Sequence, residues 1–419
     1  MGPIDPQAAA ANTRADHMPI GFIVGVAACS LVALGALAVV AAGGALPAGI
    51  GLTLALLPIP ALLAGVLYLD RLEPEPRSSL VFVFLWGAAA AALIGLIGTA
   101  AGSQLITTPT LQPGGFAVAS TTAVIGVAAL EETLMGVVLV GLLLLRPQEI
   151  DGVSDGVVYG SMVGLGFALI DNIYYYTQAS RYGFNGVATT FVLRGVVSQV
   201  CQALFASLIG AGVAYAAMTS LRRGAWAIGV GWVAAVALHA LWNVSLSAGG
   251  IRLALTYAIL AAVLLILLTA VIMDRRRIIT LIRRYLPEYE PTGIVTASDI
   301  SMLSSLHARR MARQWARLHC GLGGLRDMSE FQLSATELAL LHRRSDRALV
   351  DTDAFVLRRD GLLGGMRAAT SAFLGRLNGP LRPPWAGYGQ SCFQPIPRGR
   401  TGLPRRDQPP AQPEADRLD

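Results

Sequence analysis

The stretch Leu130-Glu131-Glu132-Thr133-Leu134-Met135 places two adjacent carboxylates in the middle of an apolar run over residues 121–145. A bilayer crossing takes roughly 20 apolar residues, so this run is long enough to span a membrane. A charge near the centre of a span costs at least ~2.5–3.5 kcal/mol on insertion scales. Each carboxylate must therefore face protein, water or metal, or hold a proton. A polar pair that only joins helices would use Asn, Gln or Ser at lower cost, so this pair indicates a functional site.

The composition describes a membrane protein with a soluble part attached. The chain has 419 residues, of which 54% are hydrophobic and 14% charged, and its mean hydropathy is +0.57. The apolar runs end near Met273, and arginines follow directly. The net charge of +6 therefore favours anionic lipid as a partner, and no nucleic-acid motif accompanies it. The 4 cysteines are scattered, so no disulfide framework or zinc ribbon is indicated.

Eight apolar runs are long enough to cross a membrane, so we expect an all-α fold, a polytopic membrane bundle of about eight transmembrane helices. The runs cover residues 18–42, 48–69, 79–101, 121–145, 156–176, 187–218, 225–247 and 253–273. Most loop arginines fall on one side, and the other side has only Arg181 and Arg252. The positive-inside rule then predicts a multi-pass protein of the cell membrane with both termini cytoplasmic.

Four segments are expected along the chain. They are a cytoplasmic N-terminal segment (1–17), a transmembrane domain (18–273), a basic cytoplasmic helical region (274–379) and a Pro-rich disordered tail (380–419).

Three finer features are also expected. The loop over residues 102–120 is either a lid or a long turn. Residues 274–285 are predicted to form a basic helix lying on the anionic inner leaflet. Beyond it, helices are predicted over about 299–320 and from Ser334-Ala335-Thr336-Glu337, a capping-box pattern.

The fifth span carries polar groups that could meet the two glutamates. Asp171 and Asn172 lie within it, and Tyr175 follows Asp171 by one helical turn on the same face. An Asp-Asn pair this close to a helix end could also be a snorkelling terminus. Four glycines of the same span should allow close helix packing; they are Gly156, Gly160, Gly164 and Gly166.

The sixth and seventh spans add a cation and an imidazole. Arg194 and Gln202 lie on one polar stripe of the sixth span, and Arg194 could be the counter-ion that keeps a buried carboxylate ionised. His239 is the only histidine inside a span, and Asn243 lies one turn after it on the same face. All these groups lie near the midplane or in the outer half, so we expect them to gather in one site.

Together these motifs resemble the PrsW family of intramembrane metalloproteases, which is related more distantly to the CAAX prenyl protease type of membrane endopeptidase. The resemblance covers residues 121–247 and is most specific over 155–175, with the elements Asp-Gly-x-x-Tyr-Gly and Gly-Leu-Gly-Phe-Ala. Glu131-Glu132 matches the family's double glutamate, and His239 with Asn243 matches its last histidine motif.

Three positions depart from the family pattern. Met135 stands where the family's Glu-Glu-x-x-Lys has Lys, and Asp171 replaces the Glu of Glu-Asn-x-x-Tyr. Gln202 stands where the family has a histidine. Because a carboxamide is a poor zinc ligand, this motif set implies either a metal site with one histidine plus carboxylates or a catalytically dead site.

The resemblance implies a metallopeptidase site that holds a divalent metal, expected to be zinc. Metal ligands would be His239 and Asp171, with Gln202 at the degenerate ligand position. Glu131 or Glu132 would act as general base on a metal-held water, and the metal would polarise the scissile carbonyl.

Four further residues would support the reaction that the resemblance implies. Asn243 and Arg194 would stabilise the oxyanion or orient the reacting groups, with Asn172 and Tyr175 as supporting residues. The expected substrate is a single-span regulatory membrane protein of the anti-sigma-factor type. A substrate helix must partly unwind to expose its amide, and cleavage is expected near the extracytoplasmic surface.

Two other function classes remain open from the sequence. One is a proteolytically inactive relative that binds membrane helices in a polar groove. The other is a proton-coupled transporter, since buried Glu, Asp, His and Arg also describe a proton relay. Transport is the least favoured, because no inverted repeat of the span pattern is found.

Overall fold

The structure is a computed structural model that describes residues 20–70, 74–100, 111–112, 115–116, 121–219, 221–248 and 250–376. The predicted segments 1–17 and 380–419, and most of the 102–120 loop, lie outside these ranges. The α-helices are α2 (Ile20–Ala42), α3 (Ala45–Leu56), α4 (Ile59–Leu69), α5 (Arg77–Ala100), α6 (Thr121–Leu145), α7 (Val153–Ser180), α8 (Gly183–Thr219), α9 (Leu221–Ala248), α10 (Gly250–Tyr285), α11 (Ala297–Leu303), α12 (Leu306–Asp346) and α13 (Thr352–Arg376).

Shorter elements complete the described part. Two 3-10 helices, η1 (Pro147–Glu149) and η2 (Leu286–Thr292), follow α6 and α10. Strands β1 (Leu111–Gln112) and β2 (Gly115–Phe116) pair antiparallel between α5 and α6.

The predicted bundle of eight membrane helices is confirmed. Eight candidate spans are long and apolar enough to cross a membrane within the described ranges. The second span is made of α3 and α4, which are separated at Leu57 and Pro58. Pro58 and Pro60 explain the break, because proline lacks the amide N–H that continues a helix and its ring clashes with the preceding turn.

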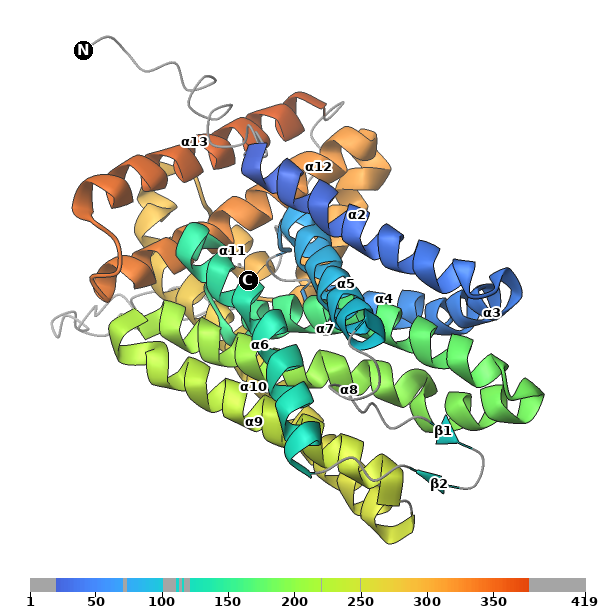
Figure 1. The fold of residues 1–419 in the computed structure, drawn as a ribbon. Helices are drawn as coiled ribbons and strands as arrows, with labels where there is room; N and C mark the ends of the chain where they lie inside the picture. The colour runs from blue at the N-terminus through green and yellow to red at the C-terminus, as the bar shows by residue number, and fades with distance from the viewer. Residues whose placement is uncertain are drawn as a thin grey trace, which may run out of the picture.

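The α7 helix is the most buried candidate span and lies at the centre of the bundle between α5 and α8 (Figure 1). Its glycines allow this packing, as predicted. A Cβ atom at Gly156, Gly160 or Gly164 would collide with the backbone of α8, and one at Gly166 would collide with the carbonyl oxygen of Phe84 on α5. Because these backbones nearly touch, α7 and α8 can bring polar side chains close together in the membrane interior.

Several loops rich in arginine meet at one end of the bundle, which we call the arginine-rich end. Arg146 lies 3.4 Å from the Ser79 hydroxyl at the start of α5. Arg275 donates to the carbonyl oxygen of Tyr68, 3.0 Å away at the end of α4. These contacts agree with the prediction that the loops after the second, fourth and eighth spans share one side of the membrane.

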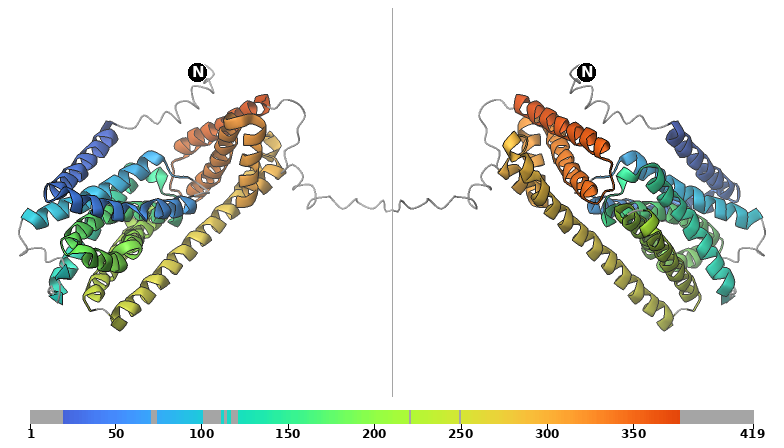
Figure 2. Two further views of the ribbon diagram at one scale, coloured as in Figure 1. Left: turned by 90° about the vertical axis from the view of Figure 1, so that its right-hand side faces the viewer. Right: turned by 90° about the vertical axis from the view of Figure 1, so that its left-hand side faces the viewer.

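The C-terminal helices form a second core at the arginine-rich end (Figure 2). The 36 residues of α10 extend about 54 Å, well beyond a hydrocarbon core of roughly 30 Å. Its last turns contribute Ile278 and Ile282 to a core shared with α11, α12 and α13. Residues 274–285 are helical, as predicted, but they continue α10 and pack one face against protein; their contact with the inner leaflet stays a prediction.

The predicted helix start at Ser334 is wrong, because Ser334 lies inside α12 and is buried. The hydroxyl of Thr336 donates to the carbonyl oxygen of Gln332 one turn earlier, at 2.8 Å. This is the hydrogen bond that a threonine makes inside a helix, not at its start. A capping box forms instead between Thr296 and Asp299 at the start of α11. Ser334 and Glu337 have the same spacing as Thr296 and Asp299 and similar chemistry, so spacing alone cannot separate a cap from a helix interior.

Candidate functional site

Four helices bring the predicted site residues to similar depth. Glu131 and Glu132 lie on α6, Asp171 on α7, Gln202 on α8 and His239 on α9. At ~1.5 Å per residue these positions lie about 20–27 Å from the arginine-rich end of their helices. The expected gathering of separate spans at one level is therefore present in the fold, although the residues form two groups of contacts.

The first group joins both glutamates to the imidazole of His239. Nδ1 of His239 lies 2.8 Å from Oε1 of Glu132, and Nε2 lies 3.3 Å from Oε2 of Glu131. Glu132 is fully buried and His239 nearly so, whereas 12% of the Glu131 side chain is accessible. Neighbouring helix residues point about 100° apart, and here that difference lets the two carboxylates hold opposite edges of one ring.

The second group joins Asp171 to Arg194. Nη2 of Arg194 lies 2.5 Å from Oδ2 of Asp171, and the guanidinium carbon lies 3.5 Å from the centre of the Tyr175 ring. An arginine that is buried in a span needs a counter-ion, and Asp171 supplies it. The sequence predicted Arg194 as a counter-ion, and the structure identifies Asp171 as its partner.

Gln202 lies beside His239, where the family resemblance expects a second histidine. Its Nε2 is 3.4 Å from Nε2 of His239. The carbonyl oxygen of Gln202 lies against Gly164, whose missing side chain lets α7 and α8 meet at this level. The amide oxygen of Gln202 is buried and has no hydrogen-bond partner among the described residues.

Two other predicted residues lie near these groups. Asn172 is fully buried, and neither atom of its amide has a hydrogen-bond partner within the described ranges. Asn243 lies one turn after His239 on α9 and is partly buried. Buried polar atoms usually find a partner in protein or water, so the unpaired amide of Asn172 is an available donor and acceptor inside the bundle.

Aromatic residues that sequence reasoning missed contact His239 or the residues that follow Glu132 on α6. Phe205 stacks on His239 with ring centres 5.0 Å apart, and Trp232 donates to the Thr133 hydroxyl at 3.0 Å. Trp86 donates to the carbonyl oxygen of Leu134 at 2.8 Å. Phe205 follows Gln202 by three positions and so shares its helix face, which was the available signal for it.

These residues do not fit a metal centre as they are arranged. Both ring nitrogens of His239 face carboxylate oxygens, and Asp171 is occupied by Arg194. Gln202 offers a carboxamide, which is a poor ligand for zinc. In the part of the chain that the structure describes, no group of three or more His, Cys, Asp and Glu residues could hold a metal ion.

Comparison with known families supports a membrane protease. The model described as PrsW family intramembrane metalloprotease matches residues 75–271, which contain every predicted site residue. The resemblance predicted from the sequence is thus confirmed, and the match implies a metal cofactor. Comparisons with curated proteins and with solved structures gave no match.

Proposed function

Because residues 75–271 match the PrsW family, we propose that the membrane domain hydrolyses a peptide bond in or beside the membrane segment of a single-span protein. The observation that carries the proposal is the contact of His239 with both Glu131 and Glu132 inside the bundle. Two carboxylates of α6 and an imidazole of α9 form an acid–base group that a purely structural helix contact does not need. A regulatory protein such as an anti-sigma factor is the substrate class that we propose.

The accessibility of the two glutamates suggests their roles. Glu131 is the more accessible carboxylate, so we assign it as the general base that takes a proton from the attacking water and returns it to the leaving nitrogen. Glu132 is fully buried against the other edge of His239, and it orients the ring. Asn243 and Arg194 remain the proposed oxyanion and orienting groups.

No step of this proposal passes through a metal, since the donors at the site do not fit one as arranged. Zinc is the cofactor expected from the family resemblance, and the arrangement of these donors favours weak zinc binding by wild type. The proposed setting is the cell membrane with both termini cytoplasmic, and the clustering of Arg146, Arg275 and Arg277 at one end of the bundle supports it.

Cleavage in liposomes tests the proposal. The full-length protein is reconstituted with a fluorescently tagged single-span substrate, and fragments are followed by gel and mass spectrometry. Glu131→Gln and His239→Ala should each reduce cleavage at least about 100-fold, in keeping with the usual 10²–10⁴-fold value of general acid–base catalysis. Glu290→Gln, at an exposed glutamate of η2, is the matched control and should cleave normally.

A second function is favoured by two observations: Gln202 replaces the family histidine, and Asp171 is held by Arg194. The protein would then bind and retain a membrane helix without cutting it. Co-purification of intact substrate with wild type and with Glu131→Gln, with no fragments from either, would favour this function over hydrolysis.

A further inference from the structure

A small hollow lies at the arginine-rich end, between the membrane bundle and α12. The empty space between its walls, including the part that is open to solvent, is about 270 Å³. The walls come from the turn before α7, the end of α8, α10, α12 and the turn after α12. They consist of Ile150, Asp151, Ala217, Met218, Arg277, Leu340, Arg343, Arg344, Arg347 and Leu349.

Four arginines and one carboxylate line this hollow, so its charge is strongly positive. Arg344 is paired with Asp151 and also donates to the carbonyl oxygen of Pro147 at 2.9 Å. Arg277 is paired with Asp274, whose carboxylate lies 2.8 Å away and also accepts from the Ser154 hydroxyl. These two arginines therefore have structural partners.

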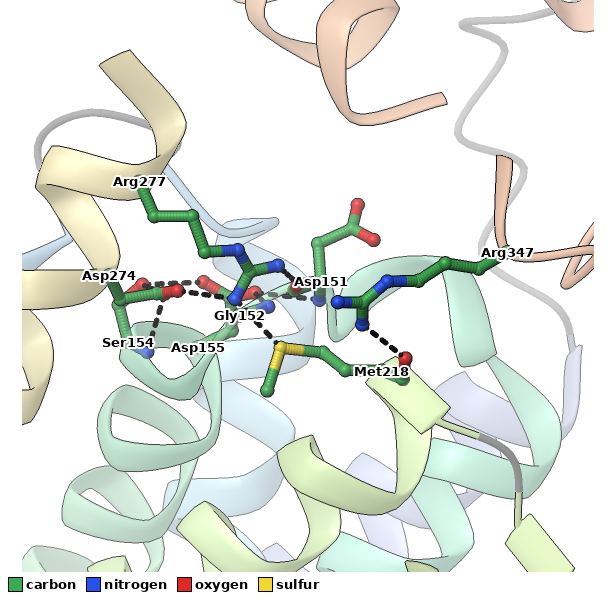
Figure 3. Close-up of polar contacts among 8 residues, drawn as sticks. All are labelled: Asp151, Gly152, Ser154, Asp155, Met218, Asp274, Arg277 and Arg347. Atoms are coloured by element: carbon green, nitrogen blue, oxygen red, sulfur yellow. Dashed lines mark hydrogen bonds and ion pairs between the residues drawn. The ribbon is translucent and has the colours of Figure 1, made fainter. Parts of the chain in front are cut away.

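Arg343 and Arg347 have no carboxylate partner among the described residues. Arg347 donates to the carbonyl oxygen of Met218 at 2.9 Å, and Arg277 contacts the sulfur of the same residue at 2.9 Å. Figure 3 shows Arg277 and Arg347 extending toward Met218 from opposite sides. Two guanidinium groups thus contact one neutral residue, Arg347 through its backbone and Arg277 through its side chain, and an anion between them would relieve their repulsion.

Buried donors without partners on the lining arginines are a second argument for an anion in the hollow. Nη1 of Arg343 and Nε of Arg277 are both buried and lack a hydrogen-bond partner in the described part of the chain. A buried donor without a partner costs about 1–3 kcal/mol. Arginine is the side chain best suited to phosphate, because its planar fork can donate two parallel hydrogen bonds to phosphate oxygens.

We propose that this hollow binds a phosphate group through Arg343, Arg347 and Arg277. A phosphate group offers several oxygens, so one such group can accept hydrogen bonds from more than one of these arginines. Met218 lies at the end of the span Gly183–Thr219, so the site is at the membrane boundary. The phosphate can therefore belong to a phospholipid headgroup or to a free phosphate ligand, and both offer the same oxygens to the arginines.

Thermal unfolding of the full-length protein in detergent tests the site with inorganic phosphate as the probe. Phosphate should raise the Tm of wild type by several degrees above sodium chloride of equal ionic strength, since a ligand that binds only the folded state stabilises it. Arg343→Gln should abolish this shift. Arg347→Gln should abolish it too, and because Arg347 is exposed, this second variant leaves no buried gap that could destabilise the fold. Arg359→Gln on α13, an arginine paired with Asp360, is the control and should keep the full shift.

Nanodiscs separate the two sources of phosphate. Stabilisation of wild type by phosphatidylglycerol over phosphatidylcholine, lost in Arg343→Gln and Arg347→Gln, identifies a lipid headgroup. Stabilisation by inorganic phosphate with no lipid preference identifies a free ligand. The proposal fails if neither probe stabilises wild type, or if both variants respond to each probe as wild type does.

Discussion

Oε1 of Glu132 on α6 lies 2.8 Å from Nδ1 of His239 on α9, although 107 residues separate them in the chain. Both side chains are almost completely buried in the middle of the helix bundle. The pair holds α6 and α9 at one level and leaves the opposite edge of the ring facing Glu131. The geometry therefore gives the two adjacent glutamates different environments and leads to different expectations for their variants.

Replacing Glu132 should destabilise the protein more than replacing Glu131. Glu132→Ala removes the shorter contact and leaves Nδ1 of His239 buried without a partner, which costs about 1–3 kcal/mol. Glu131→Ala removes a 3.3 Å contact from a more accessible side chain. Unfolding followed by circular dichroism in detergent measures the difference. Equal losses of stability in the two variants would contradict the buried role of Glu132.

Restoring the family histidine at position 202 should increase zinc binding. Gln202 lies 3.4 Å from Nε2 of His239, so Gln202→His places a second imidazole beside the first. Imidazole is a strong zinc ligand and carboxamide a weak one. Metal analysis of purified protein should give well under one zinc per chain for wild type and a higher ratio for Gln202→His. A wild-type protein with one tightly held zinc would show that the site rearranges around the metal. Gln199→His, one turn away on α8, is the control and should not raise the ratio.

Adding a methyl group at Gly164 should separate α7 from α8. The new Cβ atom would collide with the carbonyl oxygen of Gln202, whereas a Cβ atom at Gly126 on α6 meets nothing within 4 Å. Gly126→Ala should therefore be neutral or slightly stabilising, because alanine favours a helix by up to about 1 kcal/mol over glycine. Gly164→Ala should lower the Tm by several degrees and reduce any cleavage. If Gly164→Ala is as stable as Gly126→Ala, the close approach of these helices is not required.

Asp70 should make folding stability depend on pH. Burial is the largest effect on this carboxyl and raises its pKa to about 7. The backbone amide of Glu75, which donates to it at 2.9 Å, and the charge of Arg275 both lower the pKa, but by less. An unfolded Asp titrates near about 3.9, so the folded state prefers the protonated form. The stability contributed by neutral Asp70 is complete below about pH 4 and is lost as pH rises to about 7.

The variant Asp70→Asn isolates this contribution, because its side chain has the same shape and does not titrate. Each unit of pKa shift corresponds to about 1.4 kcal/mol, so wild type should lose up to about 4 kcal/mol relative to Asp70→Asn between about pH 4 and pH 7. Thermal unfolding at half-unit steps of pH gives the two curves. Parallel curves for wild type and variant would show that Asp70 is ionised in the folded protein.

The sequence by itself determined the membrane class, the number of spans and the identity of the polar residues inside them. These follow from local properties, since the length of an apolar run and the cost of a charge in lipid do not depend on the rest of the fold. The glycines of α7 could likewise be recognised as packing positions, because small residues are what a close helix contact in a membrane requires.

The tertiary structure decided which polar groups meet. A period of 3.6 residues fixes the face of one helix, but it says nothing about the rotation and depth of its neighbours. The pairing of Asp171 with Arg194, the capture of His239 between Glu131 and Glu132, and the continuation of α10 into the C-terminal core all depend on those rotations. The hollow at the arginine-rich end is likewise lined by segments that are distant in the chain, and only their packing brings Arg277 and Arg343 to one place.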